Sequence, residues 1–107
     1  MFRRLKLFLR NSRRVHARQS DFATPCDALA VIDRFLAGAA PEYPLEWDDF
    51  ISWKNKNPFI ERIRCRIAET EPMFFSKEPA QMLRATEIVL LARNDLAAIC
   101  GAPAKSA

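Results

Sequence analysis

Apolar residues recur at helical spacing along most of this chain. Over residues 25–37 and again over 58–71 they fall three or four positions apart, and charged side chains occupy the opposite face. This period predicts amphipathic helices that bury one face. Residues 77–100 carry adjacent apolar pairs at seven-residue steps. Such a broad seam predicts a long, central, buried helix.

Polar and proline signals mark where these helices begin and end. Thr24 before Pro25, and Asn57 before Pro58, each combine an N-cap residue with a proline suited to the first helical position. We expect Pro72 to end the helix that precedes it. The pattern predicts an all-α fold, a small bundle of four to five helices. Their expected ranges are about 2–18, 25–37, 46–54, 58–71 and 77–100.

The chain divides into three predicted parts. Residues 1–18 form a basic amphipathic helix, 24–101 form the helical domain, and 102–107 form a tail that we expect to be disordered. A chain of 107 residues, of which half are apolar and only two are glycine, suits one helical domain with one modest core. No apolar run approaches the roughly 20 residues that span a bilayer, so we expect a cytoplasmic protein that is soluble or membrane-peripheral.

The positive charge is concentrated in residues 1–18. This segment holds seven of the 17 basic residues and no acidic residue, whereas the remainder holds ten basic and 13 acidic residues. On a helical wheel its basic and apolar side chains separate onto opposite halves. The basic residues that we expect to face an acidic surface are Arg3, Arg4, Lys6, Arg10, Arg13 and Arg14.

Several interpretations fit this basic helix. Its apolar half suits an anionic membrane interface, and its acid-free composition is also typical of a targeting presequence. Its arginines could instead bind nucleic acid through phosphates, without sequence specificity. The simplest interpretation is that the apolar half packs on the domain and the arginines are solvated.

The stretch from Tyr43 to Phe59 contains both tryptophans and the only tyrosine. Within it we expect a helix whose first turn carries two aspartates, where carboxylates favour the positive helix end. Its apolar arc is too wide to bury completely, so one tryptophan is expected at the surface. The candidate partner-binding residues are Tyr43, Trp47, Asp48, Asp49 and Trp53. The alternative is that both tryptophans fill the core.

The sequence offers little catalytic chemistry. His16 is the only histidine, and no nucleophile or acid is placed near it by sequence. The three cysteines are widely separated, which favours reduced, buried thiols over a disulfide or a zinc site. We therefore expect no enzyme activity, no metal and no cofactor.

The resulting hypothesis is a small, non-catalytic adaptor domain that binds another protein. Its basic N-terminal helix would dock on an acidic partner or an anionic membrane. One alternative is a nucleic-acid-binding protein that uses residues 1–18. Another is a toxin-neutralising, immunity- or antitoxin-like protein, which fits the size of the chain without any specific residue in its favour. The sequence gives no prediction of homo-oligomeric state.

Overall fold

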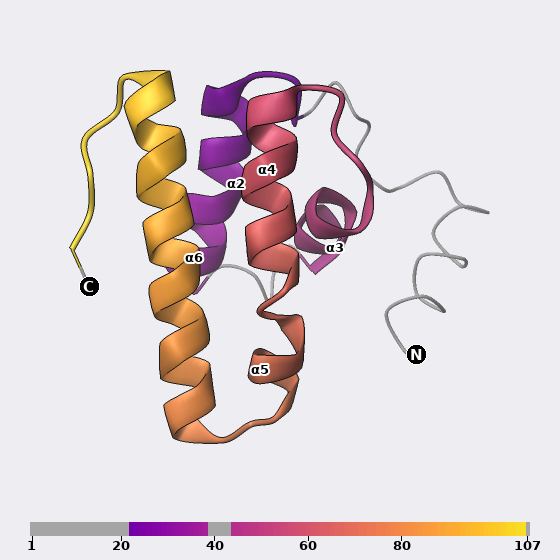
Figure 1. Cartoon of the computed structure of the whole chain (residues 1–107), viewed down its shortest axis with the longest axis vertical. Helices are drawn as coiled ribbons and strands as arrows, with labels where there is room; N and C mark the ends of the chain where they lie inside the picture. The colour runs from indigo at the N-terminus through magenta and orange to yellow at the C-terminus, as the bar shows by residue number, and fades with distance from the viewer. Residues whose placement is uncertain (1–21, 39–43, 107) are drawn as a thin grey trace.

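The computed structural model describes residues 22–38 and 44–106, which form helices joined by short turns (Figure 1). No strand occurs in these two ranges, and the all-α prediction is confirmed. The predicted helix 2–18 lies outside the described residues. The helices are α2 (Pro25–Leu36), α3 (Pro44–Ser52), α4 (Pro58–Ala68), α5 (Glu71–Phe75) and α6 (Pro79–Cys100).

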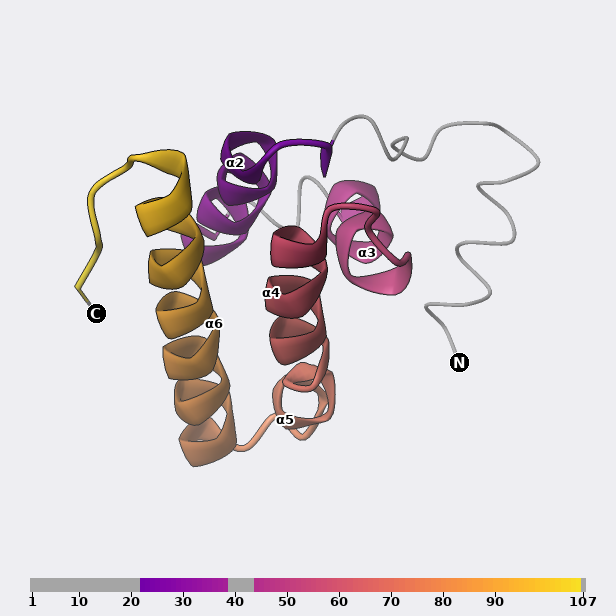
Figure 2. The same ribbon diagram turned by 45° about the horizontal axis from the view of Figure 1, so that its top comes forward.

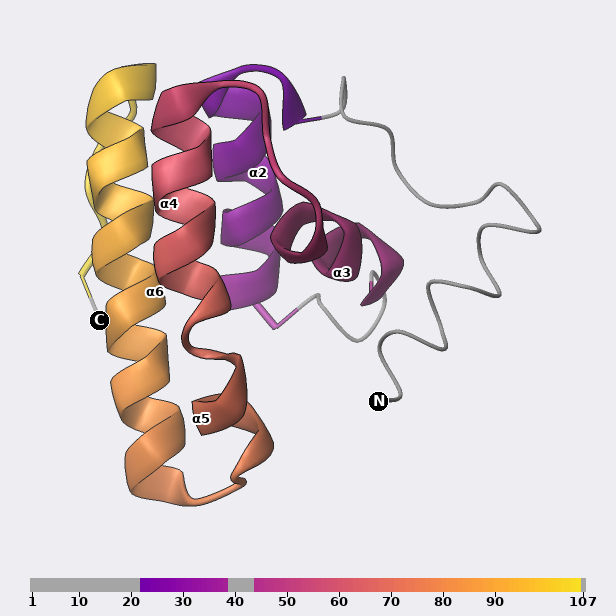
Figure 3. The same cartoon turned by 45° about the vertical axis from the view of Figure 1, so that its right-hand side comes forward.

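Helices α2 and α4 run in the same direction, and α6 runs antiparallel to both (Figure 1). Helix α6 packs against α2, α4 and α5, while α3 packs against α2 and α4 on the side away from α6. The views in Figures 2 and 3 show α5 beside the first half of α6, below the part of the bundle that contains α2 and α4. The first turns of α6 therefore have fewer helices around them than its last turns.

The predicted start signals act as expected. Thr24 forms a capping box with Asp27, with its hydroxyl accepting from the Asp27 amide at 3.1 Å. The Asn57 side chain accepts from the amides of Phe59 and Ile60, which satisfies two free donors at the start of α4. Proline follows each cap, as it does at the start of α6.

Two predicted boundaries need correction. The helix expected over 46–54 begins at Pro44, because proline fits the first helical turn as well as it fits a preceding connection. The helix expected over 58–71 ends at Ala68. Pro72 does not simply terminate it, because this proline occupies the first turn of the separate helix α5.

The core lies where α2, α3, α4 and α6 meet. Phe50 of α3 is its largest fully buried side chain, and Phe22 packs edge-on against it at 5.6 Å between ring centroids. The aliphatic side chains at its centre come from three helices and are Ile32, Ile60, Ile67, Val89 and Leu96. Burial of such side chains contributes about 1.5–3 kcal/mol each, and this supplies most of the driving force for folding.

The prediction of reduced, buried thiols is wrong for all three cysteines. Cys26, in the first turn of α2, forms a disulfide with Cys100, the last residue of α6, with 5.2 Å between their Cα atoms. The antiparallel arrangement of the two helices brings these ends together. Cys65 is a free thiol and is exposed on α4 rather than buried. Disulfides are rare in reducing compartments, so cysteine usage no longer favours the cytoplasm, and the compartment stays a prediction.

The tail expected to be disordered lies along α6. The buried guanidinium of Arg93 donates to the Pro103 carbonyl at 2.7 Å, and Asn94 exchanges two hydrogen bonds with the Lys105 backbone. Arg93 also donates from Nε and Nη2 to both carboxylate oxygens of Asp33 on α2. One side chain therefore joins α2, α6 and the C-terminal segment.

Candidate partner interface

The candidate partner-binding residues predicted between Tyr43 and Trp53 do not form one continuous surface. Tyr43 lies outside the described residues. The Trp47 ring stacks on Phe35 of α2, with 3.9 Å between ring centroids and an interplanar angle of 6°, and is part of the packing around the core. Asp48 and Asp49 are both buried. Trp47 faces α2 because its side of α3 carries the apolar residues that pack on the core. Because α3 begins at Pro44, neither aspartate lies in its first turn, contrary to the prediction.

Trp53 is the exception within this patch. It follows the last turn of α3, and 45% of its surface is exposed. This matches the expectation that one tryptophan would be left at the surface. A single exposed aromatic ring is ordinary for a protein surface, so Trp53 serves best as a comparison for other candidate sites.

The arginines of α4 do not form a free basic patch. Arg64 donates from Nε and Nη2 to both oxygens of Glu61, at 2.8 and 2.7 Å, and from Nη1 to the Ile51 carbonyl at the end of α3. Arg66 pairs with Asp95 of α6 at 2.6 Å. Because carboxylates neutralise both charges, this part of the chain gives no support to phosphate binding.

The Glu61–Arg64 pair holds the turn between α3 and α4. The hydrogen bonds from Arg64 lower the pKa of Glu61 to about 2, despite the opposing effect of burial, and the Asn55 amide adds a further donor. The buried Asn55 side chain continues the network by donating to the Phe22 carbonyl at 3.0 Å. These contacts are fully explained by a structural role.

Cys65 lies next to this pair but is poorly suited to nucleophilic chemistry. Its thiol donates to Glu61 Oε2 at 3.4 Å, and this hydrogen bond raises the pKa of the thiol. A raised pKa lowers the fraction of thiolate, which is the reactive form. Among the residues that the structure describes, no group of three or more acidic, cysteine or histidine side chains could hold a metal ion.

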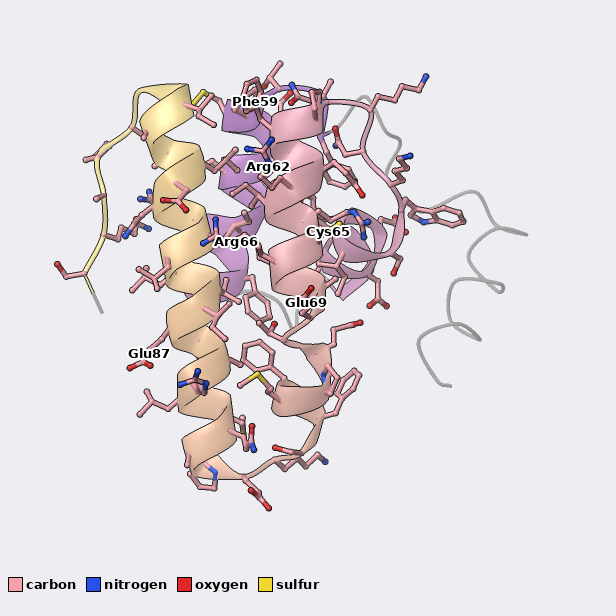
Figure 4. All side chains as sticks on the ribbon, in the orientation of Figure 1. Phe59, Arg62, Cys65, Arg66, Glu69 and Glu87 are labelled. Carbon is pink, nitrogen blue, oxygen red and sulfur yellow. A yellow bond between two sulfur atoms is a disulfide. The ribbon has the colours of Figure 1, made fainter. Side chains whose placement is uncertain are left out.

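The most unusual surface is the outer side of α6. Leu83 and Leu91 are 64% and 62% exposed, and at 100° per residue they lie about 80° apart on the helix, with Glu87 between them. Glu87 points away from the bundle (Figure 4). We call this surface the α6 outer face. Its residues are Ala80, Leu83, Arg84, Glu87 and Leu91.

The prediction that α6 is central and buried is therefore only half right. Val89, Ala92 and Leu96 are fully buried against the other helices, but α6 forms one edge of the bundle in Figures 1 and 3. Apolar residues occur around its whole circumference, whereas a helix at the edge of a fold normally carries polar residues outside. By comparison, the positions of α4 labelled in Figure 4 are mostly polar, namely Arg62, Cys65 and Arg66, together with the exposed Phe59.

The free length of the α6 outer face has clear limits. It begins at the first turn of the helix, near Ala80. Towards the other end, the C-terminal segment covers the helix at Asn94, where the Lys105 backbone is bound. The part that the described residues leave uncovered, from Ala80 to Leu91, contains one basic and one acidic residue, Arg84 and Glu87. Sequence periodicity could predict an apolar α6, but it could not predict which of its sides the other helices would leave uncovered.

Comparison of the chain with protein-family models, with curated proteins and with solved structures finds no match. Among residues 22–38 and 44–106, none of the helices combines the length and the apolar composition of a membrane-spanning segment.

Proposed function

We propose that this chain is a small, non-catalytic helical domain that binds a helical segment of a partner protein along the α6 outer face. The observation that carries the proposal is the exposure of Leu83 and Leu91 on a helix that is apolar all round. Two leucines eight residues apart are separated by about 12 Å along the helix, a spacing that an apolar stripe on a second helix can match.

The flanking charges suit a docking surface. Arg84 and Glu87 are exposed beside the leucines, and the described part of the chain provides no ion pair for either side chain. Charged residues at the rim of an apolar contact fix orientation and partner choice more than they add affinity. Burial of the two leucines would supply the attraction, at about 1.5–3 kcal/mol for each side chain.

The test is the size of the complex that the tagged chain forms in cells, covalently crosslinked before lysis and measured by size-exclusion chromatography. Leu83→Asp and Leu91→Asp are expected to shift the chain from a complex to the monomer position. Trp53→Asp is the matched control, because it also places an aspartate at an exposed apolar site, and it should leave the complex intact. A complex that survives both leucine substitutions but not the tryptophan substitution would place docking at the end of α3 instead.

Residues 1–18 keep their proposed role as a second docking element, supported by their sequence alone. The basic half would approach an acidic partner or an anionic membrane, and the apolar half would then be buried there. Binding to vesicles that contain anionic lipid should disappear when residues 1–18 are deleted, and neutral vesicles should bind neither protein. Equal binding of both proteins to anionic vesicles would remove the membrane interpretation, and a low-salt mobility shift with RNA would favour nucleic acid.

A further inference from the structure

The α6 outer face has a property that a generic docking site does not need. Between Ala80 and Leu91 its only charges are one arginine and one glutamate, one helical turn apart. A face with a single sign of charge would repel a second copy of itself. A face with one charge of each sign can pair with its own copy in an antiparallel arrangement, in which each charge meets its opposite.

We infer that the partner helix is α6 of a second copy of this chain. The inference rests on the proposed function, since it uses the same face and specifies its occupant. The two helices run antiparallel about a two-fold axis, in the register that places Arg84 of each copy opposite Glu87 of the other. Both charges of each copy then form an ion pair across the interface.

The same register also matches the apolar positions. Ala80 of one copy lies opposite Leu91 of the other, so a small side chain meets a large one. Leu83 lies level with Ile88 of the other copy, but the two positions are about 140° apart on the helix, so they lie towards opposite edges of the contact. In this register the uncovered parts of the two α6 helices overlap along their whole length, because Ala80 at one end of each copy lies opposite Leu91 at the other end of its partner. The first helical turn sets one end, and the C-terminal segment at Asn94 sets the other.

The size of the contact indicates a weak dimer. The uncovered stretch of 12 residues is about 18 Å long, and such a helix pair buries less than the roughly 800 Å² per partner of a standard stable interface. Interfaces of this smaller class are transient, with dissociation constants between about 1 µM and 1 mM. The two reciprocal ion pairs then matter mainly for register and for rejection of other partners.

The experiment is sedimentation equilibrium of the purified full-length protein from about 10 µM to 1 mM, with charge-reversal variants. The wild type should show a monomer–dimer equilibrium. R84E makes the face acidic at both charged positions, and E87R makes it basic at both, so each variant alone should dimerise at least about tenfold more weakly. An equimolar mixture of the two should form a heterodimer, because every cross-interface pair then has opposite signs.

Arg62→Glu is the matched control. It makes the same charge change at an exposed position on α4, and it should leave the wild-type association unchanged. Circular dichroism of each variant reports whether the helical fold is intact. A wild type that stays monomeric at 1 mM overturns the inference, as does a mixture of R84E and E87R that associates no better than either variant alone.

These outcomes are separate from those that test the proposed function. If the purified wild type is monomeric while the cellular complex still depends on Leu83 and Leu91, the face binds a different protein and only the self-association is wrong. If the cellular complex is indifferent to both leucines and the purified protein is monomeric, the proposed function fails as well.

Discussion

The disulfide between Cys26 and Cys100 makes a sharp prediction about stability. The two cysteines are 74 residues apart in the sequence, so the bond closes a loop that includes most of the helical domain. The chain-entropy relation for a loop of this size gives about 4.5 kcal/mol, and measured effects of disulfides are typically about 2–4 kcal/mol. Reduction should therefore lower the free energy of unfolding by about 2–4 kcal/mol. For a domain of this size the melting temperature should fall by roughly 10–20 °C.

The assay is thermal unfolding followed by circular dichroism, with and without a phosphine reductant. The double variant C26S/C100S should melt near the temperature of the reduced wild type and should not respond to the reductant. Cys65→Ser is the control, because this exposed thiol takes no part in the disulfide, and its melting temperature should remain close to that of the wild type. Three reactive thiols in the unreduced, denatured protein, in place of one, would refute the reasoning.

Two further predictions concern the polar clusters. Asp33→Ala leaves the buried Arg93 guanidinium without its carboxylate and should lower the free energy of unfolding, measured by urea titration, by about 2–4 kcal/mol. This range is slightly below that of fully buried pairs because Asp33 is partly exposed. Lys105→Ala removes the half-exposed second cation and should cost less than about 1 kcal/mol, so equal costs for the two variants would contradict the assigned roles. Glu61 has a folded-state pKa of about 2, below its ordinary value of 4.5, so its stabilising contribution is complete above pH 4.5 and is lost as the pH falls towards 2. The difference in unfolding free energy between the wild type and Glu61→Gln should therefore shrink between pH 4.5 and pH 2. A difference that is independent of pH would argue against the pairing of Glu61 with Arg64.

The parts of the fold that local chemistry determines could be predicted from the sequence. Thr24 and Asn57 each precede a proline, and a helix begins at the next residue in both cases. Pro72 shows the limit of the same reasoning, because a proline that ends one helix can also occupy the first turn of another. The local pattern did not distinguish the two, since a helix of one turn leaves almost no periodic signal.

The missed features depend on contacts between distant residues. Cys26 and Cys100 meet only because α2 and α6 are antiparallel and the start of α2 lies level with the end of α6. The local pattern makes Trp47 a candidate surface residue, and only its stacking on Phe35 of α2 shows that it is packed. The exposure of Leu83 has the same origin, because an apolar pattern predicts a need for burial but does not identify the neighbour that provides it.

The most direct test of the docking claim is site-specific photo-crosslinking with the full-length protein in cells. A photoreactive amino acid is placed at Leu83 in one protein and at the exposed Trp53 in another, and the crosslinked peptide is identified by mass spectrometry. Position 83 should give one dominant protein adduct, the α6 segment of a second copy, and position 53 should not. A dominant adduct at position 53 with none at position 83 would show that the α6 outer face is not the docking surface.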